Sequence, residues 1–210
     1  RSPEPTMASD VLSGQGLPAA LKPISTFLQR AKEIEARDPV VAYYARLHAV
    51  TLAIELRSKL PAQDTQVLLQ LMDAMEAEKR ELDKAGVDEP SAHVENFAQE
   101  LFARADEADR QGPRDMKVGR AFYASSVIID VCRQFGDLSA DLQEKHKYAR
   151  WRFVEISKAT KEGREPAPPP DLSANDLFLG GDTQRRSGDD DGCSVGPAEG
   201  DGAGLGADGP

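Results

Sequence analysis

Residues 37–47 read RDPVVAYYARL, and this stretch shows how the chain is divided into helices. A proline fits the first turn of a helix, where its missing N–H would have no partner, and it disfavours helical geometry at the residue before it. The Asp38-Pro39 pair therefore predicts that one helix ends near Arg37 and that the next begins at Pro39.

The chain on either side of this stretch shows the same alternation of helical period and helix-stopping residues. Gly86 and the Gly112-Pro113 pair stand where helical runs end, and Ser91 and Ser139 are suitable N-caps for the runs that follow them. No run before residue 162 alternates apolar and polar residues over the length of a strand, so an all-α fold is expected. The expected helices cover about residues 23–37, 39–59, 63–85, 91–111, 114–135 and 139–161.

The helices fall into two sets of three that share a faint repeat. Residues 31–33 (AKE) precede Pro39 at the same spacing at which residues 105–107 (ADE) precede Pro113. Loops of only a few residues make consecutive helices antiparallel neighbours. We therefore expect two tandem antiparallel three-helix bundles, over residues 18–87 and 88–163.

The two ends of the chain differ from this helical body. Residues 163–210 hold 11 of the 17 glycines and carry 3 Lys and Arg against 10 Asp and Glu. Such a segment cannot bury enough apolar surface to offset the entropy lost on ordering, so residues 164–210 are predicted to be a disordered, acidic, Gly/Pro-rich tail. Residues 1–6, ahead of Met7, are interpreted as a cloning remnant within a flexible N-terminus that reaches residue 17.

Composition excludes several classes of function. The remainder of the chain has 23 Lys and Arg against 26 Asp and Glu, which argues against binding to duplex DNA. No apolar run is long enough to span a bilayer and the N-terminus does not read as a signal peptide, so a cytoplasmic protein is expected. With only Cys132 and Cys193, neither a disulfide framework nor a four-cysteine zinc site is expected.

Catalytic patterns are absent from the sequence as well. The three histidines stand far apart, and neither a glycine-rich phosphate loop nor a nucleophile motif occurs. We expect a protein that is not an enzyme and that needs no cofactor or metal.

Several stretches resemble one known family. They are RDPVVAYYARL at residues 37–47, AFYAS at 121–125 continuing to IDV at 129–131, and KHKYARW at 145–151, with LMD at 71–73 and residues 102–110 in the matching order. They resemble the vacuolar-protein-sorting-associated Vta proteins, called LYST-interacting proteins in animals. The resemblance covers roughly residues 18–166.

This resemblance implies a fold, binding partners and a cellular location. It implies two microtubule-interacting-and-transport (MIT) domains that bind C-terminal tails of ESCRT-III subunits, the charged multivesicular body proteins. It also implies a role at endosomal membranes in multivesicular body sorting, beside the AAA ATPase that disassembles ESCRT-III. The family docks on that ATPase through a C-terminal region that residues 163–210 do not resemble, so we expect a truncated chain or one cut within the family's linker.

The last expected helix has two apolar faces when it is unrolled at about 100° per residue. The face that a bundle would bury is predicted to hold Leu142, Ala149, Phe153, Ile156 and Thr160. Trp151 and Val154 lie on the opposite side among cations, which suits an amphipathic segment bearing carboxylates. The alternative is that Trp151 packs against the preceding bundle. The predicted partner-binding set is Lys147, Tyr148, Arg150, Trp151, Val154 and Lys158.

The third expected helix shows the same pattern with the opposite charge. Its core stripe is predicted to be Val67, Leu68, Leu71, Met75 and Leu82. Leu69 and Met72 point elsewhere and are bordered by Asp73 and Glu76, as suits a helical ligand rich in leucine and arginine. The second helix is predicted to supply the other wall through the stripe of Val41, Ala45, His48 and Leu52, or else to turn that stripe towards a second neighbour. The predicted set in the first bundle is His48, Leu52, Leu69, Met72, Asp73 and Glu76.

Two other functions fit parts of the pattern. The basic and aromatic run 145–152 suits single-stranded nucleic acid, although carboxylates at Glu144 and Glu155 interrupt it. A helical scaffold without any binding surface explains the periodicity but not the positions of Met72 and Trp151.

Overall fold

The computed structural model describes residues 12, 14, 16–61, 65–86 and 88–169, and its regular elements are all helices. The expected all-α class is confirmed. Residues 1–11 of the predicted flexible N-terminus and residues 170–210 of the predicted tail lie outside the described residues. The elements are η1 (Ala19–Ile24), α2 (Ser25–Ile34), α3 (Pro39–Glu55), η2 (Arg57–Lys59), α4 (Thr65–Ala85), α5 (Pro90–Gln111), α6 (Met116–Val131), η4 (Cys132–Phe135) and α7 (Ala140–Glu162).

The helix break at Asp38 and Pro39 is confirmed. Helix α2 ends at Ile34, and α3 begins at Pro39 with Asp38 as its N-cap. The Asp38 carboxylate accepts a hydrogen bond of 3.0 Å from the backbone N–H of Val41. This bond satisfies one of the N–H groups that the first turn of a helix leaves without a partner.

Most of the other helix ends agree with the expected ones or move by a residue or two. Ser139 caps α7 by accepting a bond from the N–H of Leu142, as expected. Ser91, expected as an N-cap, instead lies inside α5, because Pro90 already occupies the first helical turn and Glu89 precedes it with φ of 49°. The first helical segment also begins earlier than predicted, as a 3-10 helix at Ala19.

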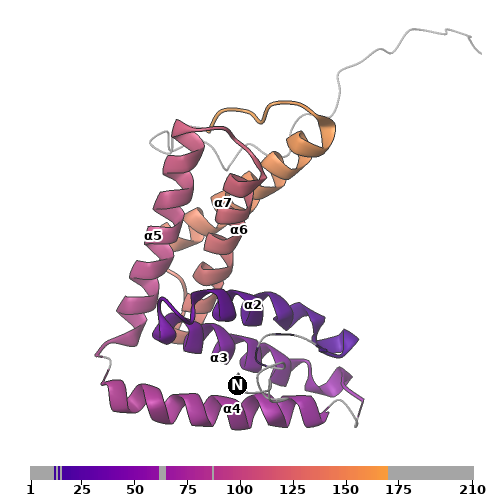
Figure 1. Cartoon of the computed structure of the whole chain (residues 1–210), viewed down its shortest axis with the longest axis vertical. Coiled ribbons are helices and arrows are strands. Elements are labelled where there is room, and N and C mark those ends of the chain that lie inside the picture. The colour runs from indigo at the N-terminus through magenta and orange to yellow at the C-terminus, as the bar shows by residue number, and fades with distance from the viewer. Residues whose placement is uncertain (1–11, 13, 15, 62–64, 87, 170–210) are drawn as a thin grey trace, which may run out of the picture. The chain divides into compact units, whose positions relative to one another are not determined.

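Each set of three helices packs around its middle member. Helix α3 packs against both α2 and α4, and α6 packs against both α5 and α7 (Figure 1). The core of the first set joins Leu28 of α2 and Val50 of α3 to Leu71 of α4. In the second set, the rings of Phe102, Phe122 and Tyr148 meet edge to face, with centroids 5.7–6.1 Å apart.

A third core lies across the boundary expected between residues 87 and 88. It joins Val41 and Ala45 of α3 to Phe97 of α5, Ile128 of α6 and Leu142 of α7, all buried. Close-packed interiors deform little, so the contact holds the first set of helices firmly against the second. The division into two domains remains a prediction, to which the structure adds this shared core.

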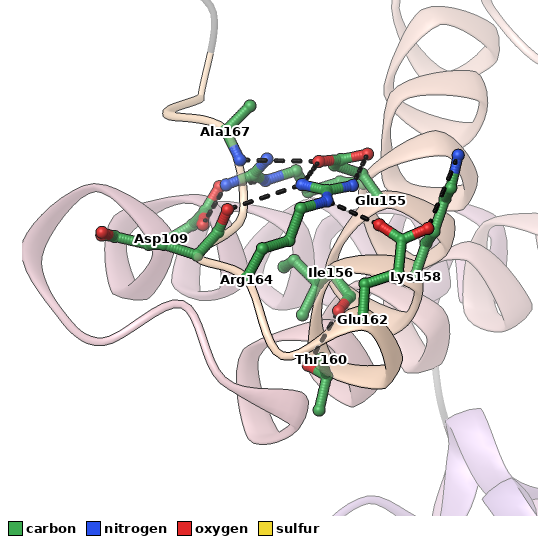
Figure 2. Close-up of polar contacts among 10 residues, drawn as sticks. Asp109, Glu155, Ile156, Lys158, Thr160, Glu162, Arg164 and Ala167 are labelled. Carbon is green, nitrogen blue, oxygen red and sulfur yellow. Dashed lines mark hydrogen bonds and ion pairs between the residues drawn. The ribbon is translucent and has the colours of Figure 1, made fainter.

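The packed part of the chain continues past the end of α7. Gly163 adopts φ of 67°, and the chain then turns back along α7 (Figure 2). Arg164 donates to Glu155 at 2.8 Å and to Glu162 at 2.7 Å, and the backbone N–H of Ala167 lies 3.5 Å from Glu155. Residues 163–169 therefore form a return segment against α7 rather than the start of the predicted tail.

Candidate partner-binding surfaces

Trp151 and Val154 of α7 are exposed apolar side chains. Trp151 is 40% exposed and Val154 is 60% exposed. At about 100° per residue, Lys147, Arg150 and Lys158 share their side of α7, and all three are exposed. These five residues are called the α7 surface below, and their exposure agrees with the prediction.

The indole of Trp151 rests on a buried ion pair. The guanidinium carbon of Arg152 lies 5.9 Å from the centroid of the Trp151 ring. Arg152 donates two hydrogen bonds to Asp109 of α5, from Nε at 2.6 Å and from Nη2 at 2.8 Å. Both side chains are fully buried. The paired geometry fixes the guanidinium plane, and the indole is supported by a group that cannot easily move.

Tyr148 does not belong to the α7 surface, which corrects the prediction. Its side chain is 1% exposed and packs between Phe102 and Phe122. Burial, reinforced by Asp106 and Asp109, raises the pKa of its hydroxyl to about 12. The buried stripe of α7 is rotated relative to the expected one: it includes Tyr148, Arg152 and Ala159, whereas Thr160, expected in the core, is exposed.

A sequence signal for this ion pair exists in α5. Asp109 follows Phe102 by seven residues and Ala105 by four, so it lies on the same helical stripe as these two buried residues. A carboxylate on a core stripe indicates a buried cation or hydrogen-bond donor, because an unpaired buried charge is very costly. Arg152, four residues after Tyr148 and four before Ile156, is the matching cation.

Leu69 and Met72 of α4 form the second exposed apolar pair. Leu69 is 51% exposed and Met72 is 39% exposed, and the neighbouring Asp73 and Glu76 are exposed too. These four residues are called the α4 surface below. The predicted core stripe of this helix is confirmed, since Leu68, Leu71 and Met75 are buried and Val67 and Leu82 pack against them.

His48 and Leu52 do not join the α4 surface, which corrects the second wall of the predicted site. His48 is 7% exposed, and its Nδ1 lies 2.9 Å from Nε2 of Gln134 in η4. Leu52 is partly buried against the first core. His48 faces the second set of helices, because α3 contacts α5, α6 and η4 as well as α2 and α4.

The burial of His48 makes the stability of the fold depend on pH. Burial is the main cause that lowers the pKa of His48 from its ordinary value of 6.5, with Asp130 acting in the opposite direction. The unfolded chain therefore takes up the proton more readily than the folded chain, so stability decreases as pH falls from about 6.5 towards the lowered pKa.

A His48→Gln variant, which cannot take up this proton, is expected to lose less stability than the unmodified chain between pH 7 and pH 5. Urea unfolding at several pH values measures the difference. Parallel curves for the two proteins would contradict the assignment.

The described residues give little support for a metal site, a reactive thiol or a membrane-spanning helix. Among those residues, no group of three or more His, Cys, Asp or Glu side chains is placed to hold a metal ion. Cys132 is buried in the shared core, and burial raises the pKa of its thiol to about 12, so the thiol stays protonated at neutral pH. None of the helices in the described ranges combines the length and apolar character needed to cross a bilayer.

Comparison with protein-family models shows the family to which this chain belongs. A family model described as Vta1 like matches residues 23–162, from η1 to the last residue of α7. The chain belongs to the Vta1-like family. The resemblance found in the sequence is confirmed.

Relatives of this Vta1-like chain are found in plants, animals and amoebae. It is 39% identical over 143 residues to the Arabidopsis thaliana protein named homolog of mammalian LYST-interacting protein 5, covering 68% of this chain and 34% of the relative. It is 39% identical over 158 residues to the human vacuolar protein sorting-associated protein VTA1 homolog, covering 73% of this chain and 51% of the relative. The Vta1-like chain therefore spans about half or less of the length of these relatives.

A solved structure shares the fold. The crystal structure of the Saccharomyces cerevisiae Vta1 N-terminal domain matches with a TM-score of 0.57 at 19% identity, covering 68% of this chain and 99% of that one. At this identity the match shows a common arrangement of helices.

Proposed function

We propose that this chain is a non-enzymatic adaptor in vacuolar protein sorting that binds the C-terminal tails of ESCRT-III subunits. The names of its relatives support the sorting pathway, since the human and Dictyostelium discoideum proteins are called vacuolar protein sorting-associated. Two further parts of the proposal rest on the resemblance found in the sequence. They are the ESCRT-III subunits as partners, and recruitment of the chain from the cytoplasm to endosomal membranes.

The observation that carries the proposal is the exposed indole of Trp151 on its buried support. Tryptophan is among the residues most enriched at interface hot spots, where truncation costs about 2 kcal/mol or more. The cations Lys147, Arg150 and Lys158 around it suit a helical segment that bears both leucines and carboxylates. A side chain already held in place by Arg152 loses little freedom on binding, which favours affinity.

The α4 surface is proposed to take a second tail. Its apolar Leu69 and Met72 are bordered by Asp73 and Glu76, so it suits a segment with basic residues. Methionine adapts its shape readily at such sites. The shared core holds the first helical set on the second, so a filament with both kinds of tail is engaged twice at a high effective concentration.

The proposed consequence is regulation of the AAA ATPase that disassembles ESCRT-III. Binding two ESCRT-III tails brings the ESCRT-III filament to the ATPase. The family is expected to bind this ATPase through its C-terminal region. In this account, the matched residues 23–162 supply the tail-binding half of that activity.

Titration with tail peptides tests the two-site proposal. Trp151 is the only tryptophan of the chain, so its fluorescence reports on the α7 surface alone. A C-terminal tail peptide that binds there is expected to change the emission, and one that binds the α4 surface is expected to release heat in calorimetry without changing it. The Met72→Asp variant should lose only the second response, because Met72 lies outside the core.

Strong competition between the two classes of tail would refute two separate sites. An oligo-dT strand that changes Trp151 emission at low salt, and loses this effect as salt rises, would favour the nucleic-acid alternative.

A further inference from the structure

A cavity of about 480 Å³ lies between the end of α2, the start of α3 and the second half of α4. Its residues on α4 include Ala77 and Glu81, which lie about 140° and 180° around that helix from Met72 at about 100° per residue. The cavity is therefore separate from the α4 surface. Its volume is typical of sites that bind a small ligand or a few residues of a peptide.

A buried arginine with unused hydrogen-bonding capacity lines this cavity. Arg46 is 4% exposed, and its Nη1 donates to both carboxylate oxygens of Glu78 at 3.0 and 3.1 Å. Its Nη2 pairs with Glu35 at 3.0 Å. Its Nε is buried and has no hydrogen-bond partner in the structure. That atom is sealed from the cavity, so the glutamates paired with Arg46 are the charged groups that an incoming peptide can meet.

Negative charge exceeds positive charge around the cavity. Glu35, Glu78 and Glu81 line it, against Arg46 in the lining and Lys84 beside it, whose Nζ pairs with Glu81 at 2.7 Å. Burial raises the pKa of Glu78 even though Arg46 acts in the opposite direction. A second cation beside these carboxylates would stabilise their charged forms.

The remaining walls are apolar. Pro39, Tyr43 and Leu82 line the cavity beside the carboxylates. Lysine and arginine commonly bury the aliphatic stem against such surfaces while the charged head reaches a carboxylate. A guanidinium also pairs with a carboxylate through two parallel hydrogen bonds, which an ammonium group cannot do.

We propose that this cavity is a docking site for an extended peptide segment of a partner in which an arginine stands beside aliphatic residues. The arginine head pairs with Glu78 and Glu81, and its stem packs on Tyr43 and Leu82. This site lies on a different flank of α4 from the surface proposed for the ESCRT-III tails, so each can fail without the other.

Nuclear magnetic resonance of the full, ¹⁵N-labelled chain tests the proposal with two blocked pentapeptides. The first is acetyl-Ala-Leu-Arg-Leu-Ala-amide, and the second has glutamine in place of arginine. The arginine peptide is expected to shift amides at the start of α3 and in the second half of α4. The glutamine peptide is expected to bind about tenfold more weakly, because it lacks the charge-assisted bonds.

Three variants locate the binding. Ala77→Trp fills the cavity from an exposed position and is expected to abolish the shifts. Glu81→Gln, at a carboxylate that is 74% exposed, is expected to weaken binding severalfold without unfolding the chain. Met72→Asp is the matched control on the opposite flank and should bind the arginine peptide normally.

Three outcomes would overturn the proposal: no shifts at millimolar arginine peptide, equal binding of the two peptides, or unchanged binding to a folded Ala77→Trp variant.

Discussion

Replacing Asp109 with alanine is expected to lower the free energy of unfolding by about 3–5 kcal/mol, because the change leaves a buried guanidinium without its carboxylate. Arg152 and Asp109 are both fully buried, so water cannot take the place of the lost partner. Arg114, whose Nε lies 3.8 Å from Asp109, would lose a second contact. Urea unfolding followed by circular dichroism measures the loss.

Two controls separate a charge effect from a packing effect. The double variant Asp109→Leu, Arg152→Met removes both charges and is expected to recover most of the stability, since apolar pairs often replace buried ion pairs at little cost. Arg104→Ala, which breaks an exposed ion pair within α5, should change stability by less than about 1 kcal/mol. A small loss for Asp109→Ala, or a double variant as unstable as the single one, would contradict this account of the pair.

Replacing Trp151 with alanine is expected to weaken binding of a tail to the α7 surface by about 2 kcal/mol or more, roughly thirtyfold in Kd. The melting temperature should change little, because the indole is 40% exposed and its removal leaves the core rings of Phe102, Phe122 and Tyr148 in place. Isothermal titration calorimetry measures the affinity without relying on tryptophan fluorescence.

A Trp151→Phe variant is the matched control for this loss. It keeps an aromatic ring over Arg152 and is expected to retain a larger part of the affinity than alanine does. Unchanged affinity in the alanine variant would remove Trp151 from the binding surface. A large fall in melting temperature would instead assign the indole a structural role.

Local signals were enough to predict most of the helix breaks, although not the N-cap of α5 or the start of the first helical segment. The Asp38-Pro39 break, the Ser139 cap and the core stripe of α4 depend on residues close together in the chain, and the structure confirms all three. The exposure of Trp151 and Met72 could be predicted for the same reason. Both residues lie outside the buried stripe of their own helix, and no neighbouring helix covers them fully.

Polar residues inside the core were harder to predict. The sequence of α7 alone does not indicate that Arg152 is buried, because arginine is rarely buried without a partner. Its partner Asp109 precedes it by 43 residues and lies on another helix. The spacing of Asp109 from Phe102 marks a buried carboxylate, but only packing between helices shows which cation meets it. The incorrect prediction for Tyr148 has the same origin, since Tyr148 and Arg152 belong to the same buried stripe of α7.

The other incorrectly predicted residues lie where the two sets of helices contact each other. The stripe of Val41 and His48 is predicted either to line the binding groove or to face a second neighbour, and one bundle considered alone does not decide between the two. The structure covers it with α5, α6 and η4, and places His48 against Gln134. Contacts between residues this far apart in the chain leave no periodic signal in a single sequence.

Hydroxyl-radical footprinting, with and without ESCRT-III tail peptides, tests most directly whether the exposed apolar side chains are partner-binding surfaces. In the free chain, Trp151 and Met72 are expected to be oxidised rapidly and the buried Met75 slowly, in line with exposures of 40%, 39% and 5%. Saturating tails are expected to protect Trp151 and Met72 and to leave Met75 unchanged. Full binding of the tails with undiminished oxidation of both Trp151 and Met72 would contradict the account.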